Sequence, residues 1–180
     1  MSRQASVARM ARAMLMSLAL TMVCAAGSGR AAASPPHRAS LSLGYGGFTI
    51  DEDTAANGGV ITLEYERFFS EAMAVRVETG GGYYLADDSS YSARGVVGLS
   101  YTLDTLRYLP YVVIGVGAQW FSDERIDPRL GLYVEGGGGL DVRVNKHLAI
   151  GAMFRFEAPT ALLRVSYVTV GARVVWRWGQ

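Results

Sequence analysis

Apolar and polar residues alternate along most of the chain after residue 40, and this pattern is typical of strands with one apolar and one polar face. The last stretch, 165–178, is the clearest case. Every even position from Val168 to Trp178 is apolar, and the odd positions are small or polar except for Val175. We expect eight strands of this kind, over residues 40–50, 60–69, 73–84, 93–103, 110–121, 129–144, 147–157 and 165–178.

The expected links between these strands mostly alternate in length. Short turns are expected at 70–72 and 145–146, and longer acidic loops at 51–59, 85–92 and 123–128, with 158–161 as a brief exception among the loops. Eight antiparallel strands in up-and-down order close into a barrel whose interior side chains just fill. The pattern therefore predicts an all-β, eight-stranded antiparallel barrel. With the N-terminus in the periplasm, the short links fall on that side, as in membrane-spanning barrels.

Alternation alone leaves open which face of the sheet points outward, since a soluble barrel such as a lipocalin turns its apolar face inward. Two features favour a membrane barrel. The glycines mostly share the polar face, where a narrow lumen needs space. Aromatic residues gather near the strand ends on the apolar face, as in the girdles of membrane barrels. These residues are Tyr45, Tyr83, Trp120 and Phe156 towards one rim and Phe69, Tyr101, Trp176 and Trp178 towards the other.

The polar face carries charges of both signs, and they form the candidate functional set. An isolated ion in a narrow, low-dielectric lumen costs several kcal/mol, so we expect these charges to pair. The predicted lumen network consists of Glu64, Glu66, Arg76, Glu78, Arg94, Glu135, Asp141, Arg143, Arg155, Glu157 and Arg173. Such a network would close the bore, whether the charges only fill the barrel or exchange partners along a gated ion path.

The N-terminus has the pattern of a secretory signal peptide. Arg3, Arg9 and Arg12 precede an apolar run over 13–26, and alanines at 31–33 supply a cleavage site, with Ala26 as the alternative. Cys24, the only cysteine, lies in this segment after Val23 rather than after a small residue, which disfavours a lipoprotein. We expect a cleaved signal over 1–33, a periplasmic tail over 34–39 and a barrel domain over 40–178.

Cleavage would leave a single domain of 147 of the 180 residues, anchored in a membrane by strands. No later segment approaches the roughly 20 apolar residues that a spanning helix needs. Because residues 1–33 contain four arginines and no acid, 13 of the 17 basic residues then face all 16 acidic ones. This acidic balance argues against a nucleic-acid partner.

The C-terminal residues resemble the signal by which bacterial outer-membrane barrels are passed to their insertion machinery. Its spacing, polar-x-Gly-x-x-apolar-x-aromatic, is met by Thr169, Gly171, Val174 and Trp176, and the chain continues through Trp178 instead of stopping at an aromatic. With 109–111, 138–141 and the order of strands, the chain resembles small outer-membrane barrels of the outer-membrane protein A and protein W type. This resemblance implies the bacterial outer membrane, contact with its lipid and lipopolysaccharide, and insertion by the barrel-assembly machinery and periplasmic chaperones.

We expect no catalytic residue, although small outer-membrane barrels include lipid A palmitoyltransferases, lipid A deacylases and omptin-like proteases. Acyl chemistry by a serine needs a nearby base, usually histidine. After residue 33 the only histidines are His37 and His147, both on the expected periplasmic side.

We also expect no metal or cofactor. The acidic runs 51–53, 87–88 and 123–124 lack a calcium-loop spacing, and the glycine runs 80–82 and 136–139 do not lead into a phosphate-binding helix. Three arginines near the outer rim could pair with lipopolysaccharide phosphates, namely Arg125, Arg129 and Arg164.

The sequence therefore favours a structural or envelope-integrity barrel with a closed, charged lumen. The alternative is a narrow porin-like channel, or the conduit for small hydrophobic molecules that resemblance to the protein W type implies. Adhesion through the surface loops comes third, because the expected loops are short.

Overall fold

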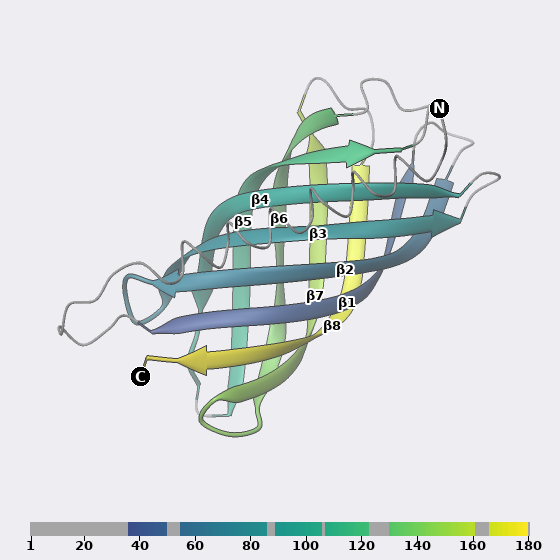
Figure 1. Cartoon of the computed structure of the whole chain (residues 1–180). Coiled ribbons are helices and arrows are strands. Elements are labelled where there is room, and N and C mark those ends of the chain that lie inside the picture. The colour runs from purple at the N-terminus through teal and green to yellow at the C-terminus, as the bar shows by residue number, and fades with distance from the viewer. Residues whose placement is uncertain are drawn as a thin grey trace. The chain divides into compact units, whose positions relative to one another are not determined.

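Eight strands form a closed antiparallel barrel in the computed structural model, which describes residues 36–49, 55–85, 89–105, 107–122, 130–160 and 166–179 (Figure 1). Each strand pairs with the next in sequence, and β8 pairs with β1. The predicted fold class is confirmed. The strands are β1 (His37–Thr49), β2 (Ala55–Phe68), β3 (Met73–Leu85), β4 (Ser90–Thr102), β5 (Tyr108–Phe121), β6 (Leu130–Arg143), β7 (Leu148–Pro159) and β8 (Ser166–Trp178).

The barrel has two ends, which we name by their links. The turn end carries the β2–β3, β4–β5 and β6–β7 links together with the start of β1 and the end of β8. The loop end carries the other links, whose residues 50–54, 86–88, 123–129 and 161–165 lie outside the described part of the chain. No helix in the described residues is long and apolar enough to cross a membrane. The signal peptide expected over 1–33 also lies outside the described residues.

Several strands are longer than the sequence predicts. β1 begins at His37 instead of residue 40, β2 at Ala55 instead of residue 60, and β4 at Ser90 instead of residue 93. In β2, Asn57, Gly58 and Gly59 pair with β1 on one side and β3 on the other. Two hydrogen-bonded neighbours therefore override a local turn signal, because strand formation depends more on context than on the residue itself.

The faces of the sheet are inverted relative to a soluble protein. Leu43, Ile114 and Val116, on the outer face, are 62–63% exposed. The inner face instead holds buried arginines and carboxylates. Soluble proteins bury apolar side chains and leave charges in water, so this outer surface suits contact with lipid rather than with water.

The expected aromatic girdles lie mostly on this outer face. At the loop end Tyr45, Tyr83 and Phe156 are exposed, while Trp120 is half-buried. The four aromatic residues predicted for the other rim are all exposed, namely Phe69, Tyr101, Trp176 and Trp178.

The buried charge network of the lumen

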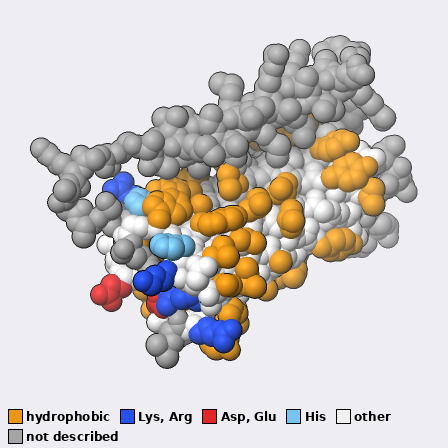
Figure 2. All heavy atoms as spheres, turned by 60° about the horizontal axis from the view of Figure 1, so that its bottom comes forward, with side chains coloured by type: hydrophobic (Ala, Val, Ile, Leu, Met, Phe, Trp, Pro, Cys, Tyr) orange, Lys and Arg blue, Asp and Glu red, His pale blue; other side chains and the backbone are white. Residues whose placement is uncertain are grey.

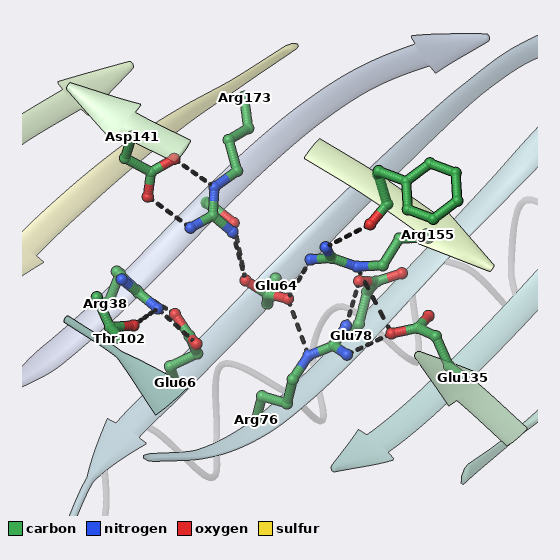
Figure 3. A network of polar contacts seen from close by, with 12 residues as sticks. Arg38, Glu64, Glu66, Arg76, Glu78, Thr102, Glu135, Asp141, Arg155 and Arg173 are labelled. Carbon is green, nitrogen blue, oxygen red and sulfur yellow. Dashed lines mark hydrogen bonds and ion pairs between the residues drawn. The ribbon is translucent and has the colours of Figure 1, made fainter. Parts of the chain in front are cut away.

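Among the described residues, eleven charged side chains meet inside the barrel, and none is more than 5% exposed. They come from seven of the eight strands, and Figure 3 shows how most of them point towards one another across the bore. Ten of the eleven residues predicted from sequence are among them. The buried set is Arg38, Glu64, Glu66, Arg76, Glu78, Arg94, Glu135, Asp141, Arg155, Glu157 and Arg173.

Glu64 on β2 is the centre of the network, because three arginines from three other strands bind it (Figure 3). Its carboxylate lies 2.9 Å from Arg76 Nε, 3.1 Å from Arg173 Nη1 and 3.3 Å from Arg155 Nη2. Ser40 Oγ donates a further hydrogen bond to it at 3.3 Å. One side chain thus links β1, β2, β3, β7 and β8 across the lumen.

On one side of Glu64 the network ends in a bidentate ion pair. Arg173 donates to both carboxylate oxygens of Asp141, from Nε at 2.8 Å and from Nη2 at 2.6 Å. Its guanidinium also lies over the ring of Tyr111, 3.8 Å from the ring centroid. Bidentate geometry and a cation–π contact both restrict the orientation of Arg173.

On the other side the network continues as a chain of alternating charges. Arg76 binds Glu135 and, at 2.5 Å, Glu78. Arg94 then binds Glu78 at 2.7 Å and also Glu157. Together with the Asp141 side, this makes one connected cluster of four arginines and five carboxylates.

Arg38 forms a second pair with Glu66 nearer the turn end, and it is absent from the set predicted from sequence. Arg38 Nη2 donates to Glu66 at 2.7 Å and to Thr102 Oγ1 at 3.0 Å. The prolines at 35 and 36 predict a tail over 34–39, but residues 37–39 belong to β1. The signal that could have found Arg38 is its spacing, since it is in phase with the inward-facing Ser40 and Ser42.

The prediction that Arg143 belongs to the lumen network is wrong, because its side chain lies outside the buried cluster. Its side chain is 29% exposed and binds Asp104 in the β4–β5 link, at 2.6 and 2.7 Å. Arg143 has the inward phase of Asp141, but it is the last residue of β6. At that position the lumen opens towards solvent, so a charge no longer needs a buried partner.

Two uncharged layers bound the network along the barrel. Towards the loop end, the hydroxyl groups of Tyr84 and Tyr167 are hydrogen-bonded at 2.5 Å, and Tyr84 also contacts Ser92 Oγ at 3.1 Å. Towards the turn end, Leu109, Ala149 and Val175 form a buried apolar cluster. Val175 breaks the alternation of β8 because it belongs to this layer.

The residues of the expected insertion signal take opposite faces of β8. Thr169 is fully buried on the lumen side, Val174 is half-buried, and Trp176 and Trp178 are exposed at the turn end. Gly171 faces Gly44 across the β1–β8 pair, where a Cβ would lie 2.7 Å from Gly44 Cα and 2.5 Å from the Leu43 carbonyl oxygen. Recognition of these residues by an insertion machinery remains a prediction.

The two histidines both lie at the turn end. His37 Nδ1 is 2.7 Å from Tyr65 Oη, and its ring stacks on Trp178 at 5.7 Å. Among the described residues, no group of three or more His, Cys, Asp or Glu could hold a metal ion. The loop acids at 51–53, 87–88 and 123–124, and also Arg125, Arg129 and Arg164, lie outside the described residues.

Comparison with known proteins gives a match in structure alone. No family model matches the chain, and neither does any curated protein sequence. Neisserial surface protein A superposes with a TM-score of 0.67 at 11% identity, over 79% of this chain and 97% of that protein. The chain has the fold of the small bacterial outer-membrane β-barrels.

Two further solved structures share this outer-membrane barrel fold. The attachment invasion locus protein Ail of Yersinia pestis matches with a TM-score of 0.59 at 16% identity, over 81% of this chain and 99% of that one. The outer membrane enzyme PagL matches with a TM-score of 0.50 at 13% identity, over 78% and 97%. Barrels with different roles therefore share this architecture, and the role of this chain must be argued from its own residues.

Proposed function

We propose that this protein is a structural barrel of the bacterial outer membrane, in which the salt-bridge network closes the lumen. The observation that carries the proposal is the burial of the eleven lumen charges, since none is more than 5% exposed. A water-filled path would leave the charged groups along it exposed. The fold and the apolar outer surface support the outer-membrane location.

The arrangement of the charges also favours a rigid plug over a gated ion path. Glu64 holds three arginines at once, and Arg173 is held by Asp141, Glu64 and the Tyr111 ring. An exchange of partners would have to break several of these contacts together inside a low-dielectric lumen. Removal of one partner from a buried ion pair costs about 3–5 kcal/mol, so such exchange would be rare.

The conduit for small hydrophobic molecules finds less support from the described lumen. Such a conduit needs an apolar passage open from the loop end. There Tyr84 of β3 and Tyr167 of β8 are hydrogen-bonded to each other, and Phe121 and Tyr133 are also buried at this end. We also do not propose catalysis, because the two histidines that could act as a base lie at the turn end. His37 contacts Tyr65, and His147 lies in the β6–β7 turn.

The test is conductance of the refolded barrel in planar bilayers, with heat-modifiable gel migration to confirm folding. We expect the wild-type barrel to be silent. The double variant Glu64→Ala/Arg155→Ala should show discrete conductance steps, because it removes an ion pair of zero net charge from the centre of the bore. Arg76 keeps Glu78 and Glu135 in this variant, and Arg173 keeps Asp141.

Two results would contradict this proposal. Conductance steps from the wild-type barrel would make it a channel, with the lumen charges as its functional site. Silence of a folded double variant would mean that the aromatic and apolar layers, and not the charge network, close the bore.

The structural role itself is tested in cells. Loss of the protein should increase the uptake of a dye that does not cross an intact outer membrane, and expression of the wild-type chain should reverse the change. Unchanged dye uptake, with the protein present in the outer-membrane fraction of the parent cells, would argue against a role in envelope integrity.

A further inference from the structure

A basic pocket lies at the turn end of the barrel, outside the lumen network. Its volume is about 620 Å³, and residues of the β4–β5 link, the β6–β7 turn and the end of β8 line it. Four of these residues are cationic, namely Arg107, Arg143, Lys146 and Arg177. Figure 2 shows Lys and Arg side chains gathered at this end, beside an outer wall that is mainly hydrophobic.

Hydrogen bonds fix the backbone around the pocket. Arg143 N donates to the Arg107 carbonyl oxygen at 2.9 Å, and Arg177 N donates to the His147 carbonyl oxygen at 2.8 Å. Asn145 Oδ1 accepts from the backbone N–H groups of His147 and Leu148 at 2.8 and 2.9 Å, which holds the β6–β7 turn. The cationic side chains therefore start from fixed positions.

The cations that line the pocket outnumber the acid that binds them. Asp104 binds Arg143 at 2.6 Å and Arg177 at 3.5 Å, and it is the only acid that the described residues pair with these cations. Arg143 Nε and Arg177 Nη1 are buried without an acceptor. A buried donor without a partner is unfavourable, so an anion that accepts from both guanidinium groups would be stabilised here.

The surroundings of the pocket indicate which anion fits. Val144 and Trp178 also line it, and both are exposed on the outer, lipid-facing side at the level of the aromatic girdle. Phospholipid headgroups lie at this level of a bilayer. We propose that the pocket binds the phosphate group of an anionic phospholipid from the adjacent leaflet. This inference rests on the outer-membrane location proposed above.

The test measures lipid retained by the refolded barrel in native mass spectrometry, with phosphatidylglycerol and phosphatidylcholine as probes. The wild-type barrel should retain one phosphatidylglycerol at about a tenfold lower lipid concentration than phosphatidylcholine, as expected for charge-assisted hydrogen bonds to a net anionic lipid. Arg177→Gln should lose this preference. Lys146→Gln, which changes an exposed side chain without an ion pair among the described residues, should reduce it without threatening the fold.

Arg67→Gln is the matched control, because Arg67 is an exposed arginine near the same end that does not line the pocket. Its preference for phosphatidylglycerol should equal that of the wild type. Equal retention of the two lipids by the wild type, or an equal loss in Arg67→Gln and Arg177→Gln, would overturn the site.

Binding of inorganic phosphate is a separate test that needs no membrane. If phosphate binds the detergent-solubilised wild type but not Arg177→Gln, and phosphatidylglycerol shows no preference, the lipid assignment is wrong and the ligand is a free anion. If the barrel does not insert into bilayers at all, the location proposed above fails instead, and gel migration and flotation with vesicles report that separately.

Discussion

At the residue scale, the lumen network holds more negative than positive charge. Its main cluster has four arginines and five carboxylates, whereas Arg38 and Glu66 form a balanced pair beside it. Glu157 lies at the edge of the cluster, where Arg94 is the one cation within ion-pair distance among the described residues, and its Oε2 has no hydrogen-bond partner. Substitutions should therefore have unequal effects according to the sign of the charge that they remove.

Replacement of Arg94 tests this inequality. Arg94→Gln would leave Glu157 buried without a cation and increase the excess negative charge, which should lower the free energy of unfolding by about 3–5 kcal/mol. Glu157→Gln removes the excess charge and keeps an acceptor for Arg94, so it should cost no more than about 1 kcal/mol. Urea unfolding of the barrel refolded in lipid vesicles, followed by tryptophan fluorescence, measures both. Equal losses would show that charge balance does not govern the network.

Which charges face the lumen can be predicted from the sequence, because side chains alternate along each strand. Which charges bind one another cannot. Glu64 pairs with Arg155 and Arg173, which are 91 and 109 residues away in sequence. These pairs depend on the stagger between strands around the closed barrel, and a local pattern does not contain that stagger. The lumen opening at the turn end, which removes Arg143 from the network, also depends on it.

At the scale of one strand, two glycines of β6 on opposite faces have different surroundings. An added Cβ at Gly139 would lie 2.5 Å from Tyr111 Oη and also against the Ala152 carbonyl oxygen, whereas at Gly136 it would meet no atom within 4 Å. Tyr111 is the ring beneath Arg173. The inward-facing Gly139 therefore leaves room for the aromatic ring beneath Arg173, and the outward-facing Gly136 does not share this role.

Alanine substitutions at Gly139 and Gly136 should distinguish the roles of these two glycines. Gly139→Ala should lower the free energy of unfolding by about 1–3 kcal/mol, because both the Ala152 carbonyl and the Tyr111 ring beneath Arg173 must move. Gly136→Ala adds one methyl group to the outer surface and should change stability by less than about 0.5 kcal/mol. Vesicle unfolding in urea again provides the comparison. A loss of the same size at both positions would mean that strand flexibility, not space for Tyr111, explains the glycines.

The ends of the strands are predicted less well from local sequence patterns than their centres are. The turn residues Asn57, Gly58 and Gly59 lie within the β2 ladder, and the proline-preceded residues 37–39 start β1. In both places the neighbouring strand supplies hydrogen bonds that cannot be predicted from the local sequence. The loop between β3 and β4 is shorter than expected for the same reason, since β4 already begins at Ser90.

At the scale of the whole molecule, the inverted surface decides between a membrane barrel and a soluble one. Periodicity predicts two faces but does not say which one points outward. Glycine and aromatic placement favour the membrane, and the exposed fractions agree, with apolar side chains outside and charges inside. A water-soluble protein with this outer surface would aggregate, because all eight strands expose large apolar side chains, which we call the apolar belt.

A charge placed on the belt tests this orientation directly. Ile114 lies in the middle of β5 and is 63% exposed, whereas Leu103 lies just past β4 at the turn end. Ile114→Arg should destabilise the vesicle-inserted barrel by about 2–4 kcal/mol and Leu103→Arg by about 0–1 kcal/mol, since the cost of a lipid-facing charge falls towards the interface. In water the two variants would be equally stable, because an exposed arginine is equally hydrated at either position. An Ile114→Arg protein that folds without lipid, and as stably as Leu103→Arg, would therefore assign the chain to the soluble barrels.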